Sequence, residues 1–257
     1  MEEMGRTYLI VSYGTTSEAV ENAILERHPN CSVRRAFTSR IEAKKAKVDH
    51  ISTVFSRLAD EGVTEITVQT LDVINGSEYE IVKDEVMKNL DLFDDVRLGT
   101  PLLTSERDYR SVCSAILKDI VPEVNEYVGE GTVIVLAGRG SDHFANSSYC
   151  QMQEMLNLSN EDEFAVTTVE GFPSFADTCK RLHRMGATEV SVVPFIVDLG
   201  EEDSEEIAGK EEVSLRMTLK SEGFKVKCIM KDLGSRPTFQ RLFSDHADAA
   251  AVLKRGQ

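Results

Sequence analysis

Apolar residues along the chain alternate between short continuous runs and stripes at helical spacing. Residues 8–12 read YLIVS and stop at a turn around Gly14, a pattern typical of a buried parallel strand. Val20 and Ile24 then recur at helical spacing, so an amphipathic helix is expected after the turn. This alternation continues along the chain, which predicts an α/β protein with parallel sheets flanked by helices.

The later elements follow from the same two patterns. Strands are predicted at 32–37, 66–74, 96–98 and 133–137. Helices are predicted through 48–58, 79–86, 109–120 and 235–254.

Two stretches of the chain repeat at one spacing. Ile134 lies 124 residues after Ile10, and Val192 lies 124 residues after Val68, each within a predicted strand followed by a glycine-containing turn. Two separate units that keep one offset indicate an internal duplication.

The duplication predicts two similar lobes. We expect an N-terminal α/β lobe over 1–125 and a C-terminal α/β lobe over 126–257, and the sequence leaves open whether the helix at 235–254 returns to the first lobe. Ligands of such folds bind at the carboxyl ends of the strands, so the site is expected there, in a cleft between the lobes.

Composition narrows the class of partner. The 29 Lys and Arg residues against 44 Asp and Glu residues give a net charge of -15, which disfavours nucleic acid and membrane surfaces. The five cysteines are widely spaced, as in buried thiols of a reducing compartment. The N-terminus lacks the pattern of a signal peptide and no apolar run is long enough to span a bilayer, so a cytoplasmic location is expected.

The first turn is a candidate anion site. Ser12, Gly14 and Thr15 lie where the first strand passes into a helix, and backbone N–H groups at a helix N-terminus attract phosphate or carboxylate. The turn lacks both glycine-rich nucleotide motifs. A tight turn that only caps the helix remains an equal alternative.

Polar residues also follow three strands of the second half. Arg139 and His143 stand in GRGSDHFAN, Glu170 stands in TVEGFP, and Glu202 stands in an acidic run at 201–206. Residues at three strand ends of one sheet can converge on one reacting point. The acidic run either guides cations to that point or forms a solvated, mobile loop.

Seven segments together resemble the anaerobic cobalt chelatases, which insert cobalt into sirohydrochlorin for cobalamin synthesis. They are IVSYGTT, RAFTSR, TVQTLDVINGSEYE, LGTPLL, GRGSDHFAN, TVEGFP and the loop ending IAGK, and they run in order from about residue 8 to residue 240. The resemblance implies a fold like that of class II chelatases and a metal chelatase (lyase) activity. It implies no permanently bound cofactor, with a divalent metal ion, cobalt, and a tetrapyrrole as substrates.

The resemblance also implies roles for single residues. It makes Glu170 a catalytic residue and metal ligand, while histidines of the family are replaced by Arg139, Glu202 and, in a further motif, Asp72. Arg139 stays protonated and is suited to binding substrate carboxylates. Asp72 is also expected to take part in substrate binding. Glu202 offers an oxygen ligand to the metal. His143 either replaces the missing imidazole as a catalytic group or only caps a helix.

These replacements leave three functions open. The chain is an active tetrapyrrole metal chelatase, a relative that binds or carries a tetrapyrrole or metal without turnover, or a duplicated α/β protein that binds an unrelated small anion. The order of the motifs disfavours the third. The sequence leaves open the natural metal and whether the chain forms a homo-oligomer.

Overall fold

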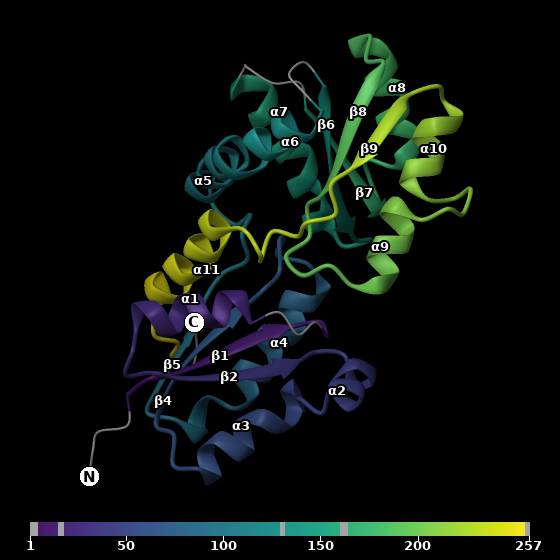
Figure 1. Cartoon of the computed structure of the whole chain (residues 1–257). Coiled ribbons are helices and arrows are strands. Elements are labelled where there is room, and N and C mark those ends of the chain that lie inside the picture. The colour runs from purple at the N-terminus through teal and green to yellow at the C-terminus, as the bar shows by residue number, and fades with distance from the viewer. Residues whose placement is uncertain (1–4, 15–17, 129–131, 160–163, 255–257) are drawn as a thin grey trace. The chain divides into compact units, whose positions relative to one another are not determined.

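The computed structural model describes residues 5–14, 18–128, 132–159 and 164–254 (Figure 1). The chain divides into two compact units. Unit 1 comprises Met1–Thr104 and Gln240–Gln257, and unit 2 comprises Ser105–Phe239.

Unit 1 is built on a five-stranded sheet in the order β3-β2-β1-β4-β5, with every strand parallel to its neighbours. Its elements are β1 (Thr7–Ser12), α1 (Ala19–Arg27), β2 (Ser32–Phe37), α2 (Arg40–Ala46), β3 (Asp49–His50), α3 (Ile51–Asp60), β4 (Glu65–Thr70), α4 (Ser77–Lys88), η1 (Leu90–Leu92), β5 (Asp95–Leu98) and most of α11 (Pro237–Ala249).

The two faces of this sheet are covered by different helices. Leu9 and Val11 of β1 pack with residues of α3 and α4, such as Phe55 and Val82, in one apolar core. Helices α1 and α11 lie side by side on the other face (Figure 1). Because successive side chains of a strand point to opposite faces, a central strand covered on both sides is continuously apolar. This explains the YLIVS run.

Unit 2 is built on a four-stranded sheet in the order β7-β6-β8-β9, again parallel throughout. Its elements are α5 (Glu106–Ala115), the π-helical turn η2 (Ile116–Ile120), α6 (Val121–Val128), β6 (Val133–Gly140), η3 (Phe144–Asn146), α7 (Ser147–Ser159), β7 (Phe164–Glu170), α8 (Phe175–Met185), β8 (Glu189–Pro194), α9 (Glu201–Ala208), α10 (Leu215–Ser221) and β9 (Lys225–Cys228).

The second sheet is also covered on both faces. Val133 and Val135 of β6 pack with Leu182 of α8 and Leu215 of α10 in one core, whereas α5, α6 and α7 lie on the opposite side of β6 (Figure 1). The two-lobed α/β architecture predicted from the sequence, with a parallel sheet in each lobe, is therefore confirmed.

The two sheets share their strand order, but the spacing of 124 residues between equivalent positions is not kept throughout. The order β2-β1-β4-β5 in unit 1 matches β7-β6-β8-β9 in unit 2. Ile10 pairs with Gln69 and Ile134 pairs with Ser191, so the second ladder is shifted by two residues relative to a constant offset of 124. A shift of two keeps each side chain on its face of the sheet, which is why the apolar pattern does not reveal it.

The observed units differ from the division expected at residue 125. Helices α5 and α6 belong to unit 2, and Tyr109 of α5 shares a side-chain hydrogen bond with Ser148 of α7. The strand expected over 66–74 is shorter, because β4 ends at Thr70 and Ile74 forms only an isolated bridge with Leu103.

Helix α11 from Gln240 onward belongs to unit 1, in which it contacts α1 and the end of β5. Arg27 of α1 bonds to Asp245 at 2.6 Å, and His28 bonds to Asp248 at 2.8 Å. The Nδ1 atom of His246 lies 2.9 Å from the carbonyl oxygen of Thr100.

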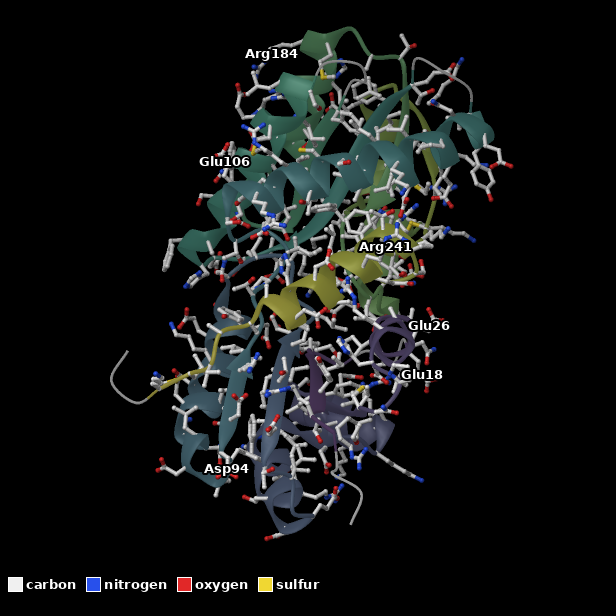
Figure 2. All side chains as sticks on the ribbon, turned by 90° about the vertical axis from the view of Figure 1, so that its left-hand side faces the viewer. Glu18, Glu26, Asp94, Glu106, Arg184 and Arg241 are labelled. Carbon is white, nitrogen blue, oxygen red and sulfur yellow. The ribbon has the colours of Figure 1, made fainter. Side chains whose placement is uncertain are left out.

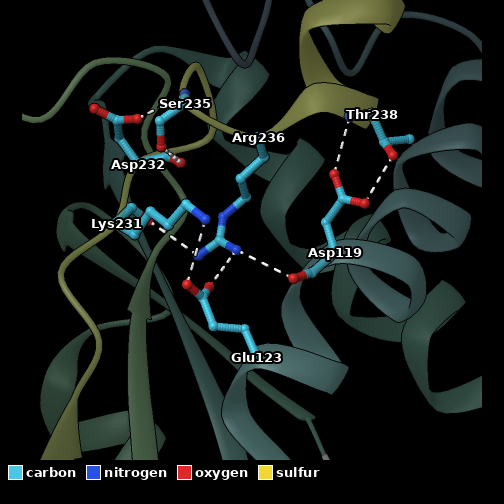
Figure 3. Close-up of polar contacts among 7 residues, drawn as sticks. All are labelled: Asp119, Glu123, Lys231, Asp232, Ser235, Arg236 and Thr238. Carbon is cyan, nitrogen blue, oxygen red and sulfur yellow. Dashed lines mark hydrogen bonds and ion pairs between the residues drawn. The ribbon is translucent and has the colours of Figure 1, made fainter. Parts of the chain in front are cut away.

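The segment before α11 is fixed in unit 2 by a buried arginine (Figure 3). Arg236 is only 1% exposed, and its Nη1 donates to Oε2 of Glu123 at 2.5 Å and to the carbonyl oxygen of Asp119 at 3.2 Å. The Nζ of Lys231 lies 3.4 Å from the same Glu123 carboxylate. Thr238 donates from its backbone N and its hydroxyl to the Asp119 carboxylate. The helix start is therefore tied to η2 and α6 by ions and hydrogen bonds.

Charged side chains cover the surface of both units. The residues labelled in Figure 2 are all exposed and project from the ribbon: Glu18, Glu26, Asp94, Glu106, Arg184 and Arg241. Within the described ranges, no helix combines the length and apolar character needed to cross a membrane.

Candidate active site

The candidate site of unit 2 lies where β6 and β7 end side by side. Gly140 pairs with Glu170 in the parallel ladder. The φ angle of Gly140 is +79°, and a Cβ atom at this position would lie 1.7 Å from the carbonyl oxygen of Glu170. Glycine is therefore required for the two strand ends to approach this closely. The approach holds Arg139, the preceding residue, within reach of the Glu170 side chain.

Arg139 is surrounded by carboxylates. Its Nη1 donates to Oδ1 of Asp203 at 2.7 Å and to Oε2 of Glu206 at 2.9 Å, whereas its Nη2 reaches Oε1 of Glu170 at 3.3 Å. The side chain of Arg139 is 39% exposed and that of Glu170 is 56% exposed. The short bonds to α9 hold the guanidinium in place, and the contact with Glu170 is longer and open to solvent.

The acidic run forms the start of α9. Glu201, Glu202 and Asp203 occupy the first turn of this helix, where negative charge is stabilised by the helix dipole. Asp203 also accepts the backbone N–H of Gly200 through Oδ2 at 3.3 Å. The alternative of a mobile loop is therefore wrong for residues 201–208, because the helix start and Arg139 both stabilise the carboxylates.

The cluster raises the pKa values of both Arg139 and Glu206, for different reasons. Burial would lower the pKa of Arg139, but the hydrogen bond and charge of Asp203, with the charges of Glu206 and Glu170, outweigh it and raise this pKa. Burial raises the pKa of Glu206; Arg139 opposes this effect, and Glu202, Asp203 and Glu170 add to it. The guanidinium therefore stays charged, and Glu206 is a carboxylate of the cluster that takes up a proton more readily than usual.

His143 and Glu202 lie at the same edge without a side-chain bond to Arg139 in the described contacts. The Nδ1 of His143 accepts the backbone N–H of Ala145 at 3.2 Å and so caps η3. With Nδ1 occupied, a neutral imidazole carries its proton on Nε2, which is then a donor. Glu202 is exposed at the N-terminus of α9. The catalytic role of His143 and the metal-binding role of Glu202 stay predictions.

The remaining predicted site residues lie in unit 1. Ser12 is buried at the end of β1, and its carbonyl oxygen accepts the backbone N–H of Thr38 at 3.0 Å. Gly14 follows at a point where a Cβ atom would lie 2.4 Å from the side chain of Glu42. Thr15 lies outside the described residues. Their substrate-binding role stays a prediction.

Asp72 stands just beyond β4 in a different electrostatic setting. The hydroxyl of Thr70 donates to its carboxylate. Burial raises the pKa of Asp72 to about 7; the Thr70 hydrogen bond opposes the shift and the charge of Glu78 adds to it. Glu78 itself accepts the hydroxyl of Thr38 at 2.5 Å. Asp72 is therefore a carboxyl group that exchanges its proton near neutral pH.

The structure thus brings together Arg139 and Glu170, as the strand-end argument predicts, and adds Asp203 and Glu206. These two were recognised only as members of an acidic run, and their helical spacing of three residues was the available signal that both face one side. Among the described residues, no group of three or more His, Cys, Asp or Glu side chains is arranged to hold a metal ion. The guanidinium of Arg139 occupies the space between the carboxylates.

Two solved structures share this fold over nearly the whole chain. SirB from Bacillus subtilis, solved with Fe³⁺, has a TM-score of 0.67 and 16% identity, and the match covers 95% of each chain. CbiX, described as the terminal enzyme for biosynthesis of siroheme in denitrifying bacteria, has a TM-score of 0.63 and 16% identity, covering 96% of this chain and 100% of the other. The fold class is that of these proteins.

Similarity to known sequences identifies the family. A sirohydrochlorin cobaltochelatase from Salmonella typhimurium is 26% identical over 96% of this chain and 97% of its own length. The corresponding CbiKC protein of Nitratidesulfovibrio vulgaris is 26% identical over 92% of this chain and 84% of its own length. The cobalt chelatase (CbiK) family matches residues 4–252, and the chain belongs to this family.

Proposed function

We propose that the protein inserts a divalent metal ion, cobalt, into sirohydrochlorin, with Glu170 as the group that accepts the two pyrrole protons one after the other and passes each to solvent. The observation that carries this proposal is that the family match runs from residue 4 to residue 252 and includes Glu170 at a strand end beside a cluster of carboxylates. Insertion takes in one divalent cation and releases two pyrrole protons, so it requires a base and a negative field, and this edge supplies both.

The contact between Arg139 and Glu170 is weak enough to be exchanged. It measures 3.3 Å and Glu170 is more than half exposed, and such ion pairs contribute about 1 kcal/mol or less. The Nη1 bonds to Asp203 and Glu206 are shorter and leave Nη2 as the group that can be redirected. A carboxylate of the substrate that binds Nη2 would displace Glu170 and free it to act as a base.

The carboxylates around this centre also define how the metal substrate is handled. Glu170 and Glu202 offer oxygen ligands to the incoming ion, and oxygen ligands favour harder cations than imidazole does. Arg139 repels a divalent cation at close range. We therefore expect a slower insertion of cobalt than in a chelatase with histidine at positions 139 and 202.

A second function is favoured by the Arg139 contacts. A guanidinium held by Asp203 and Glu206 at 2.7 and 2.9 Å blocks the space between the carboxylates, which would suit a protein that binds the tetrapyrrole without inserting a metal. The double variant Arg139→His with Glu202→His separates the two functions. A cobalt-insertion rate that rises above that of the unaltered protein would show that only the metal centre limits turnover.

An anaerobic absorbance assay tests the proposal. Purified protein is mixed with sirohydrochlorin and then with cobalt, nickel or iron(II), and the metal-dependent spectral change is compared with the spontaneous rate. We expect cobalt insertion above that rate. Spectral binding of sirohydrochlorin without faster insertion would support the non-catalytic function instead, and absence of any binding would refute both.

A further inference from the structure

Two phenylalanines stand exposed on the loops that leave the candidate site of unit 2. Phe144 follows β6 and is 84% exposed, and Phe172 follows β7 and is 56% exposed. Burial of a phenylalanine side chain stabilises a protein, and neither of these exposed residues contributes that stabilisation in full. A single exposed apolar residue is ordinary, but these two lie on adjacent strand-end loops beside Arg139 and Glu170.

The two loops are fixed against each other by close backbone contacts. The φ angle of Gly171 is +86°, and a Cβ atom there would lie 2.8 Å from the carbonyl oxygen of Ser141 and 3.0 Å from Nδ2 of Asn146. Asn146 accepts the backbone N–H of Ser141 at 3.0 Å and donates to the carbonyl oxygen of Phe172 at 2.6 Å. One buried amide therefore joins the Phe144 loop to the Phe172 loop.

Each phenylalanine also has its own support. The ring of Phe144 lies 4.1 Å from the ring of His143, which is itself fixed by its cap to η3. The loop that carries Phe172 folds back on β7, because the carbonyl oxygen of Pro173 accepts the backbone N–H of Thr168 at 2.8 Å. The Phe144 ring and the backbone on both sides of Phe172 are thus held in place, which reduces the conformational entropy that ligand binding costs.

The surroundings of the two rings define the chemistry of the occupant. Apolar rings favour a flat, conjugated face, and Arg139 favours a carboxylate at the edge of the same molecule. A tetrapyrrole ring with peripheral carboxylates has both features. We propose, on the basis of the function proposed above, that Phe144 and Phe172 form an aromatic rim that contacts one face of the tetrapyrrole while Arg139 binds a carboxylate at its periphery.

A binding titration without metal tests the rim. Sirohydrochlorin is titrated anaerobically into the unaltered protein and into the double variant Phe144→Ala with Phe172→Ala, with the change in its absorbance as the readout. We expect the double variant to bind at least tenfold more weakly. Its urea unfolding midpoint should stay within about 0.3 M of the unaltered value.

A matched control uses another exposed aromatic residue of the same unit. Tyr127 of α6 is 61% exposed, and Tyr127→Ala should bind sirohydrochlorin within twofold of the unaltered protein. The conservative variant Phe144→Leu with Phe172→Leu should recover part of the affinity because it keeps an apolar surface.

The outcomes separate the rim from the proposed function. If the unaltered protein binds and the double alanine variant binds equally well, the rim is refuted and the proposed function stands. If sedimentation shows that the same variant only abolishes self-association, the rings serve a second copy of the chain and the rim is refuted. If the unaltered protein does not bind sirohydrochlorin, both proposals fail. The titration contains no metal ion and measures binding alone, so it tests the rim even if the protein does not insert metal.

Discussion

Unit 2 contains two arginine-centred ion clusters that differ in their access to water. Arg236, drawn in Figure 3, is 1% exposed and bonds to Glu123 and to two backbone carbonyl groups. Arg139 is 39% exposed, and its bonds within the described part of the chain are to side-chain carboxylates. A buried ion that loses its partner is strongly destabilised, while an exposed one is solvated by water. We therefore expect the Arg236 cluster to stabilise the fold and the Arg139 cluster to exchange partners more readily.

Removing the buried arginine should have the largest effect on stability. Arg236→Met leaves the Glu123 carboxylate with Lys231, at 3.4 Å, as its remaining ion-pair partner among the described residues. We expect the free energy of unfolding to fall by about 3 kcal/mol, at the lower end of the range for broken buried pairs. Urea unfolding followed by circular dichroism measures this change.

The exposed pair of Arg110 and Glu106 on α5 provides the control. The two side chains are 70% and 71% exposed. Arg110→Met should therefore change the unfolding free energy by less than about 0.5 kcal/mol. An equal loss for Arg110→Met and Arg236→Met would contradict the distinction between the two clusters.

Asp72 differs from both clusters, because no cationic partner contacts its carboxyl group in the described part of the chain. Its pKa is raised to about 7 by burial, so the folded state holds a proton that the unfolded state releases near pH 4. The stability from this proton is complete below about pH 4 and is lost as pH rises to about 7. A full shift of this size is worth about 4 kcal/mol, and the partial exposure of the side chain reduces the expected effect to roughly 2 kcal/mol.

The variant Asp72→Asn should remove this pH dependence. Relative to the unaltered protein, it should be more stable at pH 8 than at pH 4, because the amide never ionises. Urea unfolding of both proteins at pH 4, 5.5, 7 and 8.5 gives the difference at each pH. A difference that stays constant across this range would show that folding does not raise the pKa of Asp72.

Removing Arg139 should have a smaller effect on stability than the changes at Arg236 and Asp72. Arg139→Met is expected to lower the free energy of unfolding by about 1 kcal/mol or less. It should raise the pKa of Glu206 further, since Arg139 opposes the rise caused by burial. Carboxyl ¹³C NMR titration measures this pKa, and a fall would mean that the guanidinium does not stabilise the Glu206 carboxylate.

Much of the fold follows from local patterns in the sequence. The apolar run of β1 ends before a turn at Gly14, whereas β6 continues beyond the predicted 133–137 as far as Gly140. Parallel strands place their carboxyl ends at one edge. This reasoning places Arg139 beside Glu170 before any coordinates are known. Positions 140 and 171 need glycine because the backbone there has positive φ angles. These angles arise where the loops after β6 and β7 meet, a contact that the sequence does not show.

Other features depend on contacts that are distant in the sequence. The acidic run at 201–206 has the composition of a solvated loop, but Arg139 and the positive end of α9 stabilise it as a helix. The amphipathic pattern of α5 does not reveal which sheet it covers, which is why the boundary was expected near residue 125. The raised pKa of Asp72 results from burial, and no spacing of residues encodes this directly.

The most direct test of the account compares Glu170→Gln with Glu201→Gln in the anaerobic cobalt-insertion assay. Glu201 is an exposed carboxylate in the first turn of α9 and controls for the loss of one negative charge. If Glu170 accepts the pyrrole protons, Glu170→Gln should lower the initial rate by about 100-fold or more, bind metal-free sirohydrochlorin within about twofold of the unaltered protein, and differ from Glu201→Gln, which should keep at least half of the rate. A Glu170→Gln variant that inserts cobalt as fast as the Glu201→Gln variant would contradict the account.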